Sequence, residues 1–243
     1  MSNSSRPDYL LSSKLLRGFR DAAIDNAREL LHEASLLRSH HHHARAFFGA
    51  RIAIEEIGKA VQAFDALGRN INDPAVSARV IDNFADHEKK LWAAAFPLMQ
   101  RSPEQRDDVV ALIESMISAR MDTETALRTA IDPLSDPLGP CVNAPGTRVS
   151  AAQAGRWVDL ARTLFSHAET YVYSPTKIRT RAEDDAFALK PAALLASTDF
   201  WNFYMARMNA GDAAFDKAVE AYHRSRTTYS PRFDGGDLEC RDS

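Results

Sequence analysis

The spacing of apolar residues is the feature that most restricts the fold of this chain. From Lys14 to Leu37, apolar side chains recur at steps of three and four residues, with Arg and Glu between them. This period matches one face of an α-helix. Alternation of apolar and polar residues, the pattern of a half-buried strand, does not occur over any useful length. The chain is therefore predicted to be all-α.

Capping and helix-breaking residues divide this helical pattern into elements. Gly68 suits the position after a helix. Asp73-Pro74 and Ser102-Pro103 are each typical of a helix start, because proline is tolerated in the first turn. Ser150 is a further candidate cap. The predicted helices are 14–37, 44–67, 74–98, 103–127, 151–171, a segment from 180 that Pro191 interrupts, and 198–224.

A stretch rich in proline and glycine separates the fourth and fifth predicted helices. Residues 131–148 hold four prolines and two glycines, which predicts a long ordered loop or a hinge. We expect a bundle of about five core helices over 14–175 and a C-terminal helical pair over 176–224 packed on it. The polar residues 225–243 are expected to form a disordered tail.

Composition limits the function classes. The net charge of -3 gives no general attraction to nucleic acid, so contact with RNA would require a local basic patch. Cys141 and Cys240 form neither a disulfide framework nor a metal-ligand pattern, which fits a reducing compartment. The N-terminus lacks the apolar core of a signal peptide, and no apolar run approaches the length of a membrane span. We expect a cytoplasmic protein without a membrane partner.

A charged cluster lies in the apolar second helix. Glu55 and Lys59 are four residues apart, in the order that favours a surface pair. Glu56 lies on a helical stripe of small and apolar residues and is predicted to be partly buried, so it needs a cationic or donor partner. His87, at a comparable depth on the next helix, is the predicted partner. This pair either forms part of a functional site or only fixes the helix register.

Several motifs resemble those of the AbiV family of phage abortive-infection proteins, a branch of the HEPN helical domains. The resemblance covers roughly residues 15–189. It implies an HEPN-like bundle, a role in bacterial defence through RNA or translation, and a polar site that includes Lys90 together with Glu55, Glu56, Lys59 and His87. The matching motifs are Asn26-Ala27 with Leu30-Leu31, Ala44-Arg45-Ala46, Ala53 to Ala60 (AIEEIGKA), Asp86-His87-Glu88-Lys89-Lys90, Tyr171-Val172 and Ser174-Pro175.

Many HEPN proteins are metal-independent ribonucleases with an Arg-x4-6-His motif. In that chemistry His transfers protons and Arg stabilises the charge on the phosphorus centre. Arg38 with His43, and Arg162 with His167, match the spacing. The first pair lies at a helix-helix corner and is attributed to chance. The second lies on the helix where HEPN nucleases usually carry the motif, so Arg162 and His167 are the candidate catalytic residues, in a site completed by a second copy of the chain.

Other conspicuous segments have less specific interpretations. The run His40–His43 is predicted to be a solvated corner, because a metal needs convergent ligands. No metal or cofactor is expected. The basic run Lys177–Arg181 is either a phosphate-binding patch or a solvated helix start. Aromatic residues of the last helix are expected to pack against the bundle or a dimer partner.

The sequence thus predicts an abortive-infection protein, active as a homodimer, and leaves open whether it is an enzyme. One hypothesis is an HEPN endoribonuclease that acts on RNA. The alternative is a non-catalytic helical protein that binds a phage or translation component. A third is a helical scaffold whose polar core only sets register.

Overall fold

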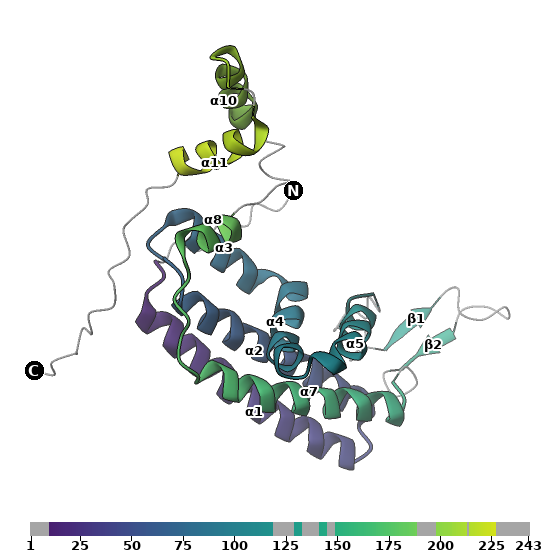
Figure 1. Cartoon of the computed structure of the whole chain (residues 1–243). Coiled ribbons are helices and arrows are strands. Elements are labelled where there is room, and N and C mark those ends of the chain that lie inside the picture. Colours follow the sequence, from purple (N-terminus) through teal and green to yellow (C-terminus); the bar gives the residue numbers. More distant parts are fainter. Residues whose placement is uncertain are drawn as a thin grey trace, which may run out of the picture. The chain divides into compact units, whose positions relative to one another are not determined.

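The computed structural model describes residues 10–118, 129–132, 141–144, 149–188, 198–212 and 214–226. Within them the chain is all-α apart from one short hairpin, which confirms the predicted fold class (Figure 1). The elements are α1 (Ser13–Ser39), α2 (His43–Leu67), α3 (Pro74–Ala85), α4 (His87–Arg101), the 3-10 turn η1 (Pro103–Gln105), α5 (Arg106–Ser118), β1 (Ala130–Asp132), β2 (Cys141–Asn143), α7 (Ala151–Val172), α8 (Arg181–Ala188), α10 (Thr198–Asn209) and α11 (Phe215–Arg226).

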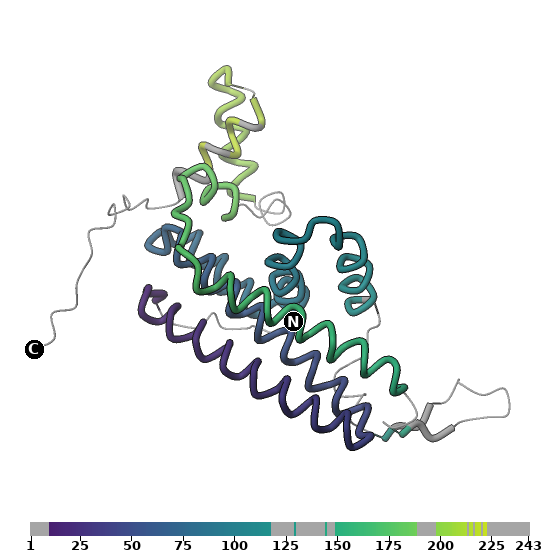
Figure 2. The backbone as a smooth tube through the Cα atoms, turned by 60° about the horizontal axis from the view of Figure 1, so that its bottom comes forward, coloured from purple at the N-terminus to yellow at the C-terminus, as the bar shows by residue number. Residues whose placement is uncertain are grey.

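The chain divides into two compact units, and the first comprises residues 13–67 and 82–176. In this unit α2 is the central helix and contacts α1, α4 and α7 (Figures 1 and 2). A helix surrounded on several sides must be apolar around most of its circumference. Its buried residues accordingly occupy most positions: Ala44, Ala46, Phe47, Gly49, Ala50, Ala53, Ile54, Glu55, Ile57, Gly58, Ala60, Val61, Ala63, Phe64 and Ala66.

Helix α1 runs antiparallel to α7. The start of α1 reaches the end of α7, where the Arg20 guanidinium donates to the Val172 carbonyl at 3.3 Å. At the other end of α1, Arg38 forms an ion pair of 2.8 Å with Asp159 near the start of α7. The N-terminus of α7 lies where predicted, because the Ser150 hydroxyl accepts a hydrogen bond from the Gln153 N–H at 3.1 Å and caps the helix.

The prediction of one helix over 74–98 is wrong, because the helix is interrupted at Asp86. Asp86 adopts an extended backbone (φ -87°, ψ 111°), and its side chain accepts a hydrogen bond from the Lys89 N–H at 3.2 Å. An aspartate in this geometry starts a new helix. The break separates α3 from α4 without interrupting the apolar spacing. The predicted fourth helix begins with η1 and α5, and residues 119–127 of that prediction lie outside the described residues.

A two-stranded hairpin lies in the region predicted as a loop or hinge. Strands β1 and β2 pair antiparallel, with Ala130 opposite Asn143 and Asp132 opposite Cys141. The loop prediction is wrong for these residues, because strands of three residues are too short to show an alternating pattern. Residues 133–140 and 145–148 lie outside the described residues.

The second compact unit comprises residues 10–12, 68–81 and the described residues from 177 onward. The single helix predicted over 198–224 is wrong, because Gly211 takes a left-handed backbone (φ 87°) between α10 and α11. Phe200 is fully buried in this unit. Its ring contacts those of Trp201, Tyr204, Phe215 and Tyr222.

The predicted domain limits, 14–175 and 176–224, and the packing of the second on the first stay predictions. Residues 189–197, which include Pro191, and residues 227–243 of the predicted tail lie outside the described residues. None of the helices that the structure describes combines the length and apolar character needed to cross a bilayer.

Candidate functional site

Helices α2 and α4 approach each other so closely at Gly58 that their backbones touch. A Cβ atom built on Gly58 would lie 2.0 Å from the Lys90 carbonyl oxygen and 2.6 Å from the Lys90 carbonyl carbon. No side chain fits in that space, so only glycine permits this crossing. Glu55 precedes Gly58 by three residues and therefore lies on the same face of α2, toward the first turn of α4.

Three charged or polar side chains meet at this crossing, and we call Glu55, His87 and Lys90 the polar centre. Glu55 Oε2 lies 3.1 Å from Lys90 Nζ and 2.8 Å from His87 Nδ1. The side chains of Glu55 and Lys90 are 7% and 6% exposed, whereas that of His87 is 72% exposed. The polar centre therefore buries an ion pair and presents an imidazole at the surface.

The carboxylate of Glu55 controls the orientation of His87. A carboxylate only accepts hydrogen bonds, so Nδ1 of His87 must carry a hydrogen in this contact. In the neutral ring, Nε2 is then the nitrogen without a hydrogen, and it can accept a hydrogen bond from a ligand. The pairing with Lys90 offsets the desolvation of Glu55, because a buried carboxylate without a cation would be costly.

The structure corrects the predicted partner of His87. That partner is Glu55, not Glu56. Glu56 Oε1 instead pairs with Lys59 Nζ at 2.6 Å, so the predicted surface pair between Glu55 and Lys59 is also wrong. The apolar stripe was misleading, because α2 is buried on most sides and its hydrophobic pattern does not identify the face that contacts α4. The spacing Glu55-x-x-Gly58 was the available signal.

The cap of α4 lies next to the polar centre. Asp86 Oδ2 is 3.1 Å from Lys89 Nζ, in addition to the backbone hydrogen bond that defines the cap. Burial alone would raise the pKa of Asp86, but the hydrogen bonds and positive charge of Lys89 outweigh it and lower the pKa below its usual value. Asp86 thus remains charged and keeps the first turn of α4, which carries His87 and Lys90, in place.

The candidate catalytic residues Arg162 and His167 do not contact each other in the chain. Arg162 is exposed, and its Nη2 donates to the hydroxyl of Ser35 on α1 at 2.7 Å. His167 is half-buried, and its Nδ1 is buried without a hydrogen-bond partner among the described residues. Five residues on a helix correspond to a rotation of roughly 140° between the two side chains. One chain therefore does not assemble an Arg–His pair.

The histidine corner between α1 and α2 is largely exposed. His40, His41 and His42 face solvent, and His41 has a left-handed backbone (φ 62°). The rings of His41 and His43 approach edge to face at 5.8 Å. Within the described part of the chain, no group of three or more His, Cys, Asp or Glu side chains is placed to hold a metal ion.

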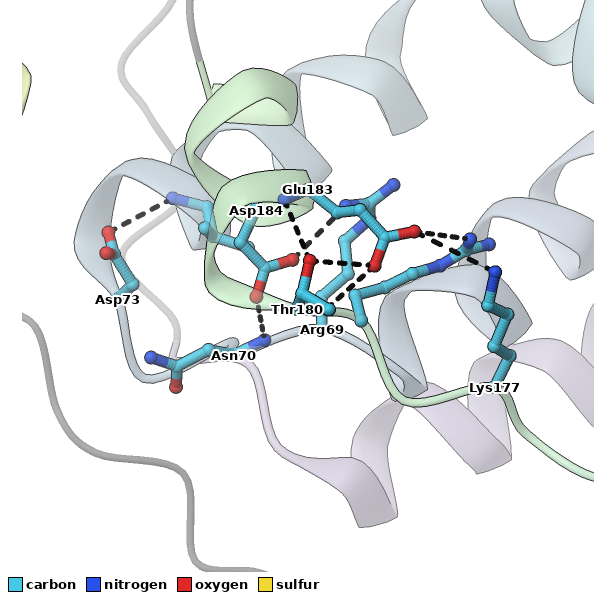
Figure 3. A network of polar contacts seen from close by, with 9 residues as sticks. Arg69, Asn70, Asp73, Lys177, Thr180, Glu183 and Asp184 are labelled. Carbon is cyan, nitrogen blue, oxygen red and sulfur yellow. Dashed lines mark hydrogen bonds and ion pairs between the residues drawn. The ribbon is translucent and has the colours of Figure 1, made fainter. Parts of the chain in front are cut away.

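The cations of the basic run Lys177–Arg181 are compensated by neighbouring carboxylates. Lys177 lies 3.9 Å from Glu183 Oε1 (Figure 3). Arg179 lies 3.5 Å from the same oxygen, and Arg181 lies 3.8 Å from Asp185. Thr180 and Glu183 form a capping box, in which the Thr180 N–H donates to Glu183 at 2.7 Å. That hydrogen bond, foremost, lowers the pKa of Glu183. This segment therefore starts a helix and has little uncompensated charge for a phosphate.

The same unit contains a buried carboxylate that joins α8 to the turn after α2. Asp184 is 2% exposed and accepts hydrogen bonds from the Asn70 N–H at 3.0 Å and from Arg69 at 3.2 Å (Figure 3). The Arg69 guanidinium also lies 3.8 Å above the ring centre of Phe187. These contacts explain the burial of Asp184 as a structural feature, and no motif in the sequence predicted them.

Comparison with known proteins locates the family in the first half of the chain. Residues 15–132 match the family model HEPN_AbiV, described as AbiV. No curated protein and no solved structure gave a significant match. The matched segment contains Glu55, His87 and Lys90 and ends before α7, which carries Arg162 and His167. The predicted family is thereby confirmed over residues 15–132, which match the AbiV-type HEPN proteins.

Proposed function

We propose that this protein acts in abortive infection of phage-infected bacteria by binding a phage or translation component, without cleaving RNA through Arg162 and His167. The observation that carries this proposal is the separation of these two side chains on α7. Arg162 is held by Ser35, and His167 has a buried Nδ1. Proton transfer and stabilisation of the phosphorus centre require both groups within reach of one phosphate.

The polar centre fits this function as the element that fixes the crossing of α2 and α4. It lies inside the segment matched to the AbiV family. Its charges satisfy one another, and Gly58 gives the two helices only one close-packed register. A binding surface made by several helices needs such a fixed geometry, because residues misplaced by about an ångström lose their contacts.

Phage protection in bacteria tests the proposal. Cells would carry the wild type, His167→Ala or, as a matched exposed control on α1, His32→Ala, with soluble protein levels equalised. Binding without cleavage predicts full protection by both variants, with cellular RNA of unchanged length after infection. Loss of protection by a folded His167→Ala variant, together with RNA fragments in wild-type cells, would contradict the proposal.

A homodimeric HEPN ribonuclease is the second candidate. It is favoured by the exposed guanidinium of Arg162, which contacts a neutral hydroxyl and, among the described residues, no carboxylate. In a homodimer, Arg162 of one chain and His167 of its partner would have to reach the same phosphate. Purified protein incubated with total bacterial RNA and excess chelator would then produce fragments, and His167→Ala would not.

A further inference from the structure

One end of the first compact unit is free of acidic residues over two separate stretches. Helix α1 ends there, and α2 and α7 begin there, as Figures 1 and 2 both show. Residues 34–54 contain arginine and histidine, residues 149–158 contain Arg156, and neither stretch contains aspartate or glutamate. The chain as a whole has a net charge of -3, so its charge is unevenly distributed.

Contacts between the three helices bring these stretches together. The rings of Phe47 on α2 and Trp157 on α7 lie 4.6 Å apart. The Arg38 guanidinium of α1 packs on Gly155, where a Cβ would lie 3.2 Å from Arg38 Nη2, and pairs with Asp159. Residues 45 and 156, two and one positions from the ring contact, therefore belong to the same end of the unit.

Three arginines at this end have no ion pair with a carboxylate of the described residues, and we call Arg45, Arg156 and Arg162 the basic end. All three are exposed. Arg45 and Arg156 have no ion-pair partner among the described residues, and Arg162 contacts the neutral Ser35 hydroxyl. The exposed rings of His40–His42 lie at the same corner.

The acidic groups near the basic end do not cancel its charge. Asp159 is already paired with Arg38. Glu33 is exposed on α1, two residues before Ser35, and therefore projects from a different side of that helix. The N-termini of α2 and α7 add partial positive charge, and the C-terminus of α1 offsets one of the two. Among the described residues of α1, α2 and α7 at this end, the arginines therefore outnumber the carboxylates even with every histidine neutral.

We infer that the basic end binds the phosphodiester backbone of a nucleic acid. Exposed guanidinium groups without carboxylate partners bind phosphate without first breaking an ion pair. The basic run Lys177–Arg181, by contrast, would have to release Glu183 and Asp185. This inference rests on the proposed function and gives it a ligand class. RNA and DNA both have a phosphodiester backbone, so the test must compare the binding of RNA with that of DNA.

Binding would be measured by fluorescence anisotropy with a labelled 20-nucleotide single-stranded RNA and the DNA of the same sequence, between 50 and 200 mM salt. The test variant is the double substitution Arg45→Glu/Arg156→Glu. Each lost phosphate contact lowers the salt slope on a single strand by about 0.7, so the double variant should lose about 1.4 and bind at least about tenfold more weakly at 50 mM salt. Tighter binding of the RNA than of the DNA would identify RNA as the ligand. Equal affinities would show that the protein recognises only the phosphodiester backbone that both share.

The matched control is Lys14→Glu/Arg17→Glu, which makes the same change in net charge. Both residues are exposed in the first turns of α1, and Arg17 lies about 30 Å along the helix from Arg38. The control should bind as the wild type does. If the wild type does not bind either oligonucleotide, or if the two double variants weaken binding equally, the inference is wrong.

Two further measurements separate the possible causes of failure. Arg45→Gln/Arg156→Gln removes the charges without introducing repulsion, and it should weaken binding while leaving the circular dichroism spectrum and melting temperature unchanged. The proposed function is tested independently by the protection assay with His167→Ala. Failure of the anisotropy experiment alone would therefore remove the nucleic acid as ligand and leave the proposed function standing.

Discussion

Replacement of Gly58 by alanine tests the crossing that assembles the polar centre. The added Cβ would lie 2.0 Å from the Lys90 carbonyl oxygen, whereas ordinary van der Waals contact begins at 3.4 Å. The atoms in the way belong to the backbone of α4 and cannot rotate aside. Helix α4 must therefore move away from α2 by about 1.4 Å, the difference between these distances.

This displacement has three energetic consequences. Overpacking of a filled contact costs about 3 kcal/mol at the upper end of its range. The 3.1 Å contact between Glu55 and Lys90 lengthens, so a buried ion pair is weakened. The higher helix propensity of alanine relative to glycine offsets about 1 kcal/mol of this loss of stability. We expect the free energy of unfolding to fall by about 2–4 kcal/mol, which lowers the melting temperature by about 5–15 °C.

Urea unfolding followed by circular dichroism would measure the change, with Gly18→Ala as the control. Gly18 also lies in a helix, but nothing is within 4 Å of the position that its Cβ would occupy. Alanine there should stabilise the protein by up to about 1 kcal/mol. If Gly58→Ala were as stable as Gly18→Ala, the close crossing of α2 and α4 would be refuted.

Three other substitutions have defined expectations. Glu55→Gln leaves Lys90 buried without a countercharge and should lower the free energy of unfolding by about 3 kcal/mol in urea, whereas Glu55→Gln/Lys90→Met should recover part of the loss. Asp86→Ala should cost about 1 kcal/mol and Asp86→Asn less, because asparagine also caps helices. Since folding lowers the pKa of Asp86, its charge stabilises the protein above the unfolded value near 3.8. This contribution should disappear as the pH falls through the lower folded value, so acid titration should show a smaller loss of stability for Asp86→Asn than for the wild type. Gly211→Ala should cost about 1 kcal/mol because of the positive φ, and Gly211→Asn less, which thermal unfolding would show.

The sequence predicted those parts of the fold that are determined locally. Helices α1, α2 and α7 begin and end within a few residues of their predicted limits, because their caps and breaking residues are adjacent in sequence. Gly68 follows α2, and Ser150 caps α7. In these cases a single residue supplies both the signal and the physical cause, so no knowledge of tertiary contacts was needed.

The errors occurred where a local signal has two physical outcomes. Asp86 can lie within a helix or cap a new one, and the apolar spacing on either side of it is the same in both cases. Gly211 can be tolerated inside a helix or adopt the left-handed backbone that ends it. The sequence alone does not distinguish these outcomes, because the choice depends on which neighbours the two segments pack against.

The carboxylate that contacts His87 in the candidate site was predicted wrongly for a different reason. The sequence predicted a Glu–His contact made by α2, but it placed His87 on a helix continuous from Pro74 and not on α4. The choice between Glu55 and Glu56 depends on the rotation of α2 relative to α4. That rotation is fixed by the backbone contact at Gly58. A glycine in an apolar helix suggests a close approach without naming the partner. The acid-free run 34–54, on the other hand, is visible in the sequence and could have indicated the basic end.

The two charged regions of the first compact unit should therefore respond differently to mutation. In the polar centre, Glu55 has both partners within 3.1 Å, so a ligand gains little there without breaking a buried pair. At the basic end, Arg45 and Arg156 are exposed and uncompensated among the described residues. Substitutions in the polar centre should reduce phage protection only as far as they unfold the protein, and growth at lower temperature should restore it. Arg45→Gln/Arg156→Gln should reduce protection at every temperature with unchanged stability. The reverse pattern would place ligand binding at His87 and leave the basic end without a function.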